Sequence, residues 1–131
     1  MDKTLSLISI VEDDPLVRAS TRRLMRSFGY TVEDFPSAAE FLSFPRLDET
    51  ACLIADINMP DMSGVELYHR LIEDGRRIPT ILITAYPDDA VRTRALNDGV
   101  LCYLKKPFVD DELLRCVRIA LDGDKSPDEY S

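Results

Sequence analysis

Apolar positions along the chain follow two alternating patterns. Compact apolar runs, which predict buried strands, occur at residues 5–11, 30–35, 52–55, 80–84 and 101–104. Segments with a helical spacing of apolar residues lie between and after these runs, for example Val17, Thr21, Leu24, Met25 and Phe28, then Val65, Tyr68, Leu71 and Ile72, and then Leu113, Val117, Ala120 and Leu121. The chain is therefore expected to hold five strands and five helices in alternation.

Residues typical of helix ends support this division of the chain. Pro15 stands near the start of the first helix and Gly29 follows its end. Ser63 and Asp110 are expected to cap the helices that follow them, since short polar side chains accept hydrogen bonds from the first turn. Gly99 is expected to end the helix before the last strand.

Helix-length segments separate the predicted strands, and parallel strands need connections of that length. We therefore predict an α/β fold with a doubly wound, five-stranded parallel sheet and the flavodoxin-like strand order 2-1-3-4-5. Residues 1–122 would form this one domain. The polar tail 123–131 is expected to be flexible, either as a true end or as the start of a linker.

Charge and cysteine content narrow the possible partners and the location. Lys and Arg total 16 and Asp and Glu total 24, so the net charge of −8 opposes binding to a phosphate backbone, and no direct nucleic-acid contact is expected. The three cysteines are odd in number, widely spaced and set in apolar sequence, which argues against a disulfide framework or a metal site. The first residues do not resemble a signal peptide and no apolar run reaches bilayer length, so we expect no membrane contact and a cytoplasmic location.

Polar side chains gather where four of the predicted strands end. They are Glu12, Asp13 and Asp14 after the first strand, Asp56 after the third, Thr84 at the end of the fourth and Lys106 after the fifth. If the strand order reverses between the first and third strands, these loops converge at one edge of the sheet. Doubly wound proteins bind their ligands at that edge.

Carboxylates crowded at this edge would repel one another unless a cation joined them. We expect Mg²⁺, because this ion prefers oxygen ligands and usually takes one or two protein carboxylates. The expected ligands are the carboxylates of Glu12, Asp13 and Asp56 and the backbone carbonyl of Asn58.

An ionised carboxylate beside a metal, a lysine and a hydroxyl is an arrangement typical of phosphoryl transfer. Asp56 would be the nucleophile, Lys106 would add a positive charge and Thr84 a hydrogen-bond donor. Two other polar residues have simpler interpretations. Asp14 is expected to cap the first helix, and His69, the only histidine, is expected at a solvated helix position.

Four segments in this order resemble the motifs of the receiver domain of two-component response regulators. They are VEDDPLVR at 11–18, DINMPDMSG at 56–64, ITA at 83–85 and YLKKPF at 103–108. Each motif is weak alone, but together they are specific, and the resemblance covers residues 5–121. It implies a phosphoacceptor at Asp56, a metal-binding pair at Glu12 and Asp13, a metal-facing carbonyl at Asn58, a conserved-type lysine at Lys106 with a cis bond to Pro107, and switch residues at Thr84 and Tyr103.

The same resemblance implies a phosphorelay function. The phosphoryl group would come from a histidine kinase or a histidine phosphotransfer protein. It would alter the surface formed by the fourth helix, fifth strand and fifth helix, which would bind a downstream protein or form a phosphorylation-dependent homodimer. The expected chemistry is limited to self-phosphorylation and self-dephosphorylation, so the chain is not expected to be an enzyme.

The details most resemble the FixJ-like branch, in which a receiver often precedes a helix-turn-helix output domain. No such domain follows here, so a stand-alone receiver is the simplest interpretation, and a piece of a longer protein is the alternative. Two other functions stay open at this point. One is a scaffold that is never phosphorylated, and the other is a phosphatase with Asp56 as covalent nucleophile, although Asn58 stands where a second aspartate would act as general acid.

Overall fold

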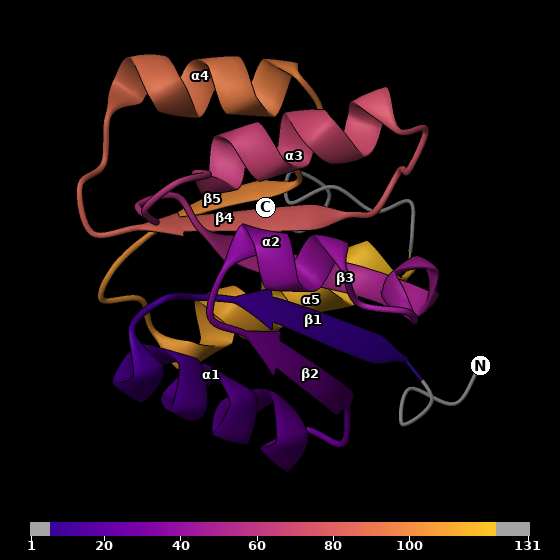
Figure 1. The fold of residues 1–131 in the computed structure, drawn as a ribbon. Helices are drawn as coiled ribbons and strands as arrows, with labels where there is room; N and C mark the ends of the chain where they lie inside the picture. Colours follow the sequence, from indigo (N-terminus) through magenta and orange to yellow (C-terminus); the bar gives the residue numbers. More distant parts are fainter. Residues whose placement is uncertain (1–5, 123–131) are drawn as a thin grey trace.

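The computed structural model describes residues 6–122, which form alternating strands and helices (Figure 1). The elements are β1 (Leu7–Val11), α1 (Pro15–Ser27), β2 (Thr31–Phe35), α2 (Ala38–Leu42), the 3₁₀ helix η2 (Leu47–Glu49), β3 (Thr50–Asp56), α3 (Gly64–Glu73), β4 (Thr80–Thr84), α4 (Asp89–Asn97), β5 (Cys102–Lys105) and α5 (Asp110–Asp122). The predicted tail 123–131 and the first residue of the first predicted strand, Leu5, lie outside the described residues.

All neighbouring strands pair in parallel in the order β2-β1-β3-β4-β5, which confirms the predicted sheet. Strand β1 lies between β2 and β3, so the order reverses there. The register pairs Val11 with Ala55 and Asp56 with Ile83. The carboxyl ends of β1, β3 and β4 are therefore level with one another.

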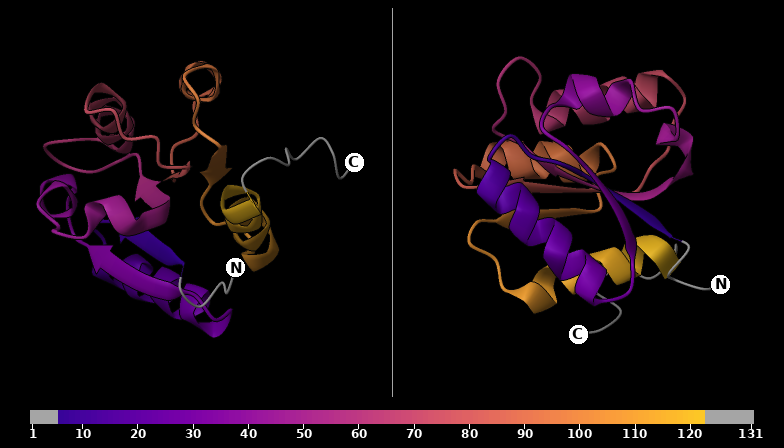
Figure 2. Two further views of the ribbon diagram at one scale, coloured as in Figure 1. Left: turned by 90° about the vertical axis from the view of Figure 1, so that its right-hand side faces the viewer. Right: turned by 60° about the horizontal axis from the view of Figure 1, so that its bottom comes forward.

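Each face of the sheet carries its own apolar core. Alternate residues of a strand point to opposite faces, so neighbouring residues of one strand belong to different cores. Ile54 and Ile81 pack with Met25 of α1 and Leu113 of α5. On the other face, Leu53, Ala55 and Leu82 pack with Phe41 of α2, Leu67 of α3 and Ala95 of α4. The helices therefore form a layer on each side of the sheet (Figure 2).

Strand β4 has the predicted bounds, and the ends of the other strands differ from the predictions by at most two residues. The largest difference is in β3, predicted at 52–55 and observed over Thr50–Asp56. This central strand pairs with β1 at Thr50 and with β4 at Asp56, so backbone pairing carries it past both ends of the apolar run. Asp56 is consequently the last residue of the strand and not the first of the loop. Strand β5 begins and ends one residue later than predicted.

Two of the three predicted helix caps are correct. The Asp14 carboxylate accepts hydrogen bonds from the Leu16 and Val17 amides, and Ser63 forms a reciprocal capping box with Glu66. The cap predicted at Asp110 is wrong by one residue, because Asp110 is already the first residue of α5. The preceding amide, that of Val109, donates to the Glu112 carboxylate at 3.1 Å.

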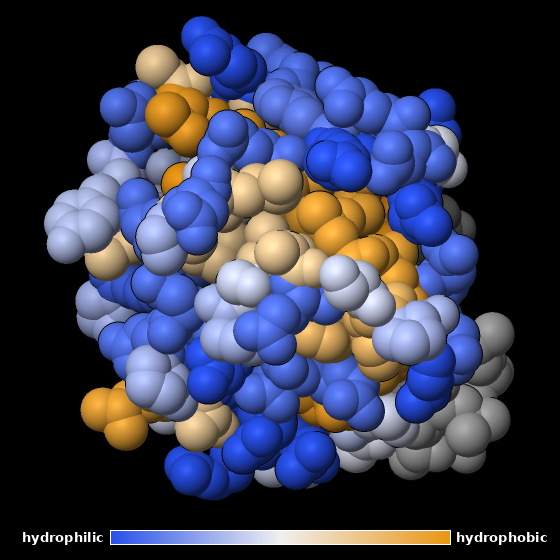
Figure 3. All heavy atoms as spheres, in the orientation of Figure 1, coloured by the Kyte–Doolittle hydropathy of each residue, from blue (hydrophilic) through white to orange (hydrophobic). Residues whose placement is uncertain are grey.

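Hydrophilic side chains cover much of the face drawn in Figure 3, with apolar ones gathered towards its middle. Within residues 6–122, no helix combines the length and the apolar character needed to cross a membrane. The three cysteines are free and buried in the apolar core, as small core residues are.

Candidate functional site

The predicted site residues come together at the carboxyl edge of the sheet. Glu12 follows β1 directly, Asp56 and Thr84 end β3 and β4, and Lys106 follows β5. Backbone hydrogen bonds continue the pairing beyond the strands, from the Ile57 amide to the Ile83 carbonyl and from the Lys106 amide to the Thr84 carbonyl, both at 2.8 Å. Rigid strand ends therefore hold each functional side chain.

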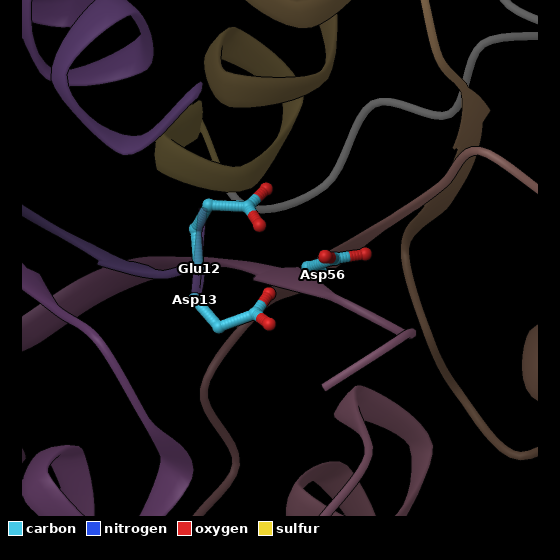
Figure 4. A group of neighbouring side chains, drawn as sticks. All are labelled: Glu12, Asp13 and Asp56. Carbon is cyan, nitrogen blue, oxygen red and sulfur yellow. The ribbon is translucent and has the colours of Figure 1, made fainter. Parts of the chain in front are cut away.

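Three carboxylates face one another at this edge (Figure 4). Each of Glu12, Asp13 and Asp56 offers an oxygen, and these oxygens lie within 4.8 Å of one another. Glu12 and Asp56 are each only 5% exposed, whereas Asp13 is exposed. An all-oxygen donor set of this size suits a hard cation such as Mg²⁺, with the exposed Asp13 leaving the site open to water. The residues present therefore fit the predicted metal.

The ammonium of Lys106 lies between the two buried carboxylates. Its Nζ donates to Glu12 Oε1 at 2.8 Å and lies 3.4 Å from Asp56 Oδ2. The pKa of Glu12 is raised to about 7, because the effects of burial, which is the largest cause, and of the neighbouring Asp56 outweigh the opposing effect of Lys106. Burial alone would lower the pKa of Lys106, but the hydrogen bond and charge of Glu12 and the charge of Asp56 outweigh it, so the net shift is upward.

The loop after β3 holds Asp56 from the other side. The Asn58 amide donates to Asp56 Oδ1 at 3.1 Å, so this oxygen is occupied while Oδ2 faces the lysine. The loop folds back closely, with the Gly64 amide 3.2 Å from the Ile57 carbonyl oxygen. A Cβ at Gly64 would lie 2.6 Å from the Asp56 carbonyl oxygen, so only glycine fits without a shift.

Both predicted switch residues have defined partners. The Thr84 side chain is 1% exposed, donates to Asn58 Oδ1 at 2.6 Å and accepts from the Tyr86 amide at 2.9 Å. Tyr103 is half-buried on β5, and its hydroxyl accepts from the Asp88 amide at 3.1 Å. Asp88 caps α4, so Tyr103 links β5 to the start of that helix.

Asp14 and His69 lie outside the cluster of carboxylates. Asp14 caps α1, as expected. His69 lies on α3, where its Nε2 is 2.8 Å from Asp98 Oδ2, and both side chains are more than a third exposed. The backbone amide of Asp14, however, donates to Glu12 Oε2 at 3.2 Å and so helps to hold that carboxylate, whereas His69 does not contribute to the candidate site.

Arg18 is a residue of the site that was not recognised from the sequence. Its Nη1 donates to the Glu12 carbonyl oxygen at 2.8 Å, and its Nε donates to Asp34 Oδ2 at 3.1 Å. Arg22 donates to the other oxygen of Asp34 at 3.2 Å. Arg18 thus anchors the turn that carries Glu12 and Asp13, while Arg22 shares only the contact with Asp34. The only signal in the sequence is the place of Arg18 on the first turns of α1.

Comparison with known families identifies the architecture. Residues 8–118 match the family described as the response regulator receiver domain. The chain belongs to this family. Receiver domains are signalling domains of two-component systems, and phosphorylation on an aspartate is characteristic of them.

Relatives of the chain are response regulators. It is 38% identical over 121 residues to the response regulator protein TodT of Pseudomonas putida, covering 92% of this chain and 53% of TodT. It is also 38% identical over 122 residues to nodulation protein W of Bradyrhizobium diazoefficiens, covering 93% of this chain and 54% of that protein. The chain thus spans about half the length of these relatives.

Solved structures show the same fold. The structure of FixJ-N superposes with a TM-score of 0.82 at 32% identity, covering 92% of this chain and 97% of that one. The response regulator StyR also gives a TM-score of 0.82, at 38% identity, over 89% of this chain and 59% of that one. The predicted family resemblance is therefore confirmed.

Proposed function

We propose that Asp56 is the phosphoacceptor of this receiver and takes a phosphoryl group from a histidine kinase or a histidine phosphotransfer protein. One observation carries the proposal: a buried carboxylate at the end of the central strand faces both a lysine ammonium and two further carboxylates. A structural turn residue needs no such surroundings. The arrangement suits a nucleophile that must be held rigidly and still be reached by a donor.

Each residue has a definite part in this transfer. Asp56 Oδ2 attacks phosphorus, an acyl phosphate forms, and the bond to the donor breaks with its electron pair leaving on the donor. Lys106, 3.4 Å from Asp56 Oδ2, places its positive charge where the phosphoryl oxygens gather. The Asn58 amide holds Asp56 Oδ1 and so orients the nucleophile.

The metal ligands in this proposal are Glu12, Asp13, Asp56 and the backbone carbonyl of Asn58. When bound, Mg²⁺ supplies positive charge that offsets the carboxylates and the incoming phosphoryl oxygens. Glu12 keeps Lys106 near the nucleophile through its 2.8 Å contact, and Arg18 keeps Glu12 in place by holding its carbonyl oxygen.

The output surface in this proposal is formed by α4, β5 and α5, and it binds a downstream protein or a second copy of the chain. Thr84 and Tyr103 convey the change from the phosphoryl group to this surface. Tyr103 contacts the amide of Asp88 at the start of α4, so a movement of the ring reaches that helix directly. Ala95 is the one buried residue of α4. Because the helix buries so few side chains, a shift of α4 costs little free energy.

The three buried, free cysteines support a reducing compartment, so we place this function in the cytoplasm.

Labelling with a small phosphodonor tests the assignment. Incubation with radiolabelled acetyl phosphate and Mg²⁺ is expected to label the wild-type chain and not Asp56→Asn, and a chelator is expected to abolish labelling. Asp61→Asn is the matched control, because Asp61 is an exposed acid of the same loop, and it should label normally. Equal labelling of Asp56→Asn and wild type would refute the assignment. A scaffold would show no labelling of any variant, and a phosphatase would turn over an added phosphomonoester.

A further inference from the structure

The hydroxyl of Thr84 is fully engaged in the resting protein. It accepts a hydrogen bond from the Tyr86 amide at 2.9 Å, and its own proton is donated to Asn58 Oδ1 at 2.6 Å. A threonine hydroxyl has one proton to donate. Thr84 therefore cannot donate to a phosphoryl group on Asp56 until its bond to Asn58 breaks.

Asn58 contacts both the proposed phosphoacceptor, Asp56, and the proposed switch residue, Thr84. Its backbone amide donates to Asp56 Oδ1 at 3.1 Å, while its side chain accepts from Thr84. The two bonds come from different atoms of one residue, so the side-chain bond can be removed without removing the backbone bond. The side chain lies at the exposed edge, whereas Thr84 is 1% exposed.

We propose that Asn58 is a positioning residue that holds the Thr84 hydroxyl in its resting orientation and so opposes the switch that phosphorylation drives. This inference rests on the proposed function of Asp56. It assigns to the Asn58 side chain a role separate from that of its backbone carbonyl, which we proposed as a metal ligand.

The competition between the two acceptors gives the sign of the effect. The side-chain oxygen of Asn58, Oδ1, is a neutral acceptor, whereas a phosphoryl oxygen is charged and accepts a hydrogen bond more strongly. The Thr84 hydroxyl therefore donates preferentially to the phosphoryl group. The free energy gained is reduced by the hydrogen bond to Asn58 that must be broken. Removing that bond should favour the switched state about two- to tenfold, the usual worth of one neutral hydrogen bond.

One arm of the test needs no phosphate. If Asn58 fixes the Thr84 rotamer, Asn58→Ala frees the hydroxyl, and the Tyr86 amide loses its steady partner. Hydrogen exchange of the Tyr86 amide, followed by NMR, should then be about two- to tenfold faster than in wild type. Asn58→Asp keeps an acceptor oxygen and should restore wild-type protection. Unchanged exchange in Asn58→Ala, or equal loss in Asn58→Asp, would overturn the inference.

The second arm uses beryllium fluoride with Mg²⁺ as a stable analogue of the phosphoryl group. Asn58→Ala should bind it about two- to tenfold more tightly than wild type. In a Thr84→Val background the same substitution should have no effect, because there is no hydroxyl left to hold. A gain that persists in the Thr84→Val background would show that Asn58 acts by another route and would overturn the inference. Asp61→Asn, an exposed change in the same loop, should bind as wild type does.

Labelling of Asp56 separates the two proposals. If wild type is labelled by acetyl phosphate but Asn58→Ala matches it in both arms, the role of Asn58 is wrong and that of Asp56 stands. If wild type is not labelled and does not bind beryllium fluoride, both proposals fail.

Discussion

Lys106 Nζ lies 2.8 Å from Glu12 Oε1, although the two residues are 94 positions apart in the sequence. The contact joins the ends of β1 and β5, the first and last strands within residues 6–122. Glu12 shows a raised pKa, about 7, even with this partner, because burial penalises its charged form more than the lysine favours it. Three carboxylates share this one ammonium, so the protein alone leaves net negative charge at the site, as a cation site requires.

Lys106→Met should destabilise the chain most at alkaline pH. The folded pKa of Glu12, about 7, exceeds the ordinary 4.5, so stability falls as pH rises from about 4.5 to 7. Without Lys106 the pKa of Glu12 rises further, and the loss extends to higher pH. We expect a cost of about 3 kcal/mol at pH 8.5, where the buried carboxylates are left unpaired, and a smaller cost at pH 5.

Urea unfolding at both pH values, with a chelator present, measures this difference. Lys105→Met is the control, because Lys105 is the exposed neighbour and should change stability by less than about 0.5 kcal/mol. An equal cost of Lys106→Met at both pH values would contradict the charge argument.

Gly64→Ala should disturb the loop that carries the acceptor. The new Cβ would lie 2.6 Å from the Asp56 carbonyl oxygen and 3.2 Å from Ile57 Cα, so the backbone must shift. We expect a loss of about 1–3 kcal/mol in thermal or urea unfolding and slower labelling of Asp56. Gly75→Ala meets no atom within 4 Å and has only the strain of its φ of 79°, so it should lower stability without slowing labelling.

The site acids and lysine could be predicted because each follows an apolar run in a chain whose strands alternate with helices. Parallel strands end at one edge, so their first polar residues become neighbours. The doubly wound sheet predicted from this alternation has helices on both faces, which the structure shows in the separate cores that contain Leu53 and Ile54. These features depend only on local pattern and on the rules of sheet topology.

Other features depend on atoms that no local pattern reveals. In the acidic turn, Arg18 donates to the backbone carbonyl of Glu12. The direction of that carbonyl is fixed only by the way the chain turns from β1 into α1. The start of α5 was misplaced because Asp110, Asp111 and Glu112 are all polar, and the residue that reaches back to Val109 is Glu112. The Asn58–Thr84 contact depends on the fold bringing the loop after β3 to the end of β4, where Thr84 Oγ1 lies 2.6 Å from Asn58 Oδ1.

Arg18→Gln should weaken the support of the acidic turn. It removes the donor to the Glu12 carbonyl and one of the two arginines on Asp34. We expect a loss of about 1–2 kcal/mol in unfolding free energy and weaker Mg²⁺ binding, measured by titration calorimetry. Arg22→Gln is the matched control, because Arg22 contacts Asp34 but not Glu12, and it should leave Mg²⁺ binding unchanged. If both variants weaken binding equally, the contact to Glu12 is not the cause.

The buried hydroxyl pair formed by Ser9 of β1 and Thr50, at the amino end of β3, should behave as one unit. Ser9 Oγ and Thr50 Oγ1 are 2.8 Å apart on adjacent strands, and the two residues are 0% and 7% exposed. Either Ser9→Ala or Thr50→Val alone leaves the other hydroxyl buried without a partner. Each should lower the free energy of unfolding in urea by about 1–3 kcal/mol. The double variant removes both hydroxyls, leaves no unsatisfied group, and should cost clearly less than the sum. Additive losses would mean that each hydroxyl finds another partner, and the two strands would then be joined here by backbone pairing alone.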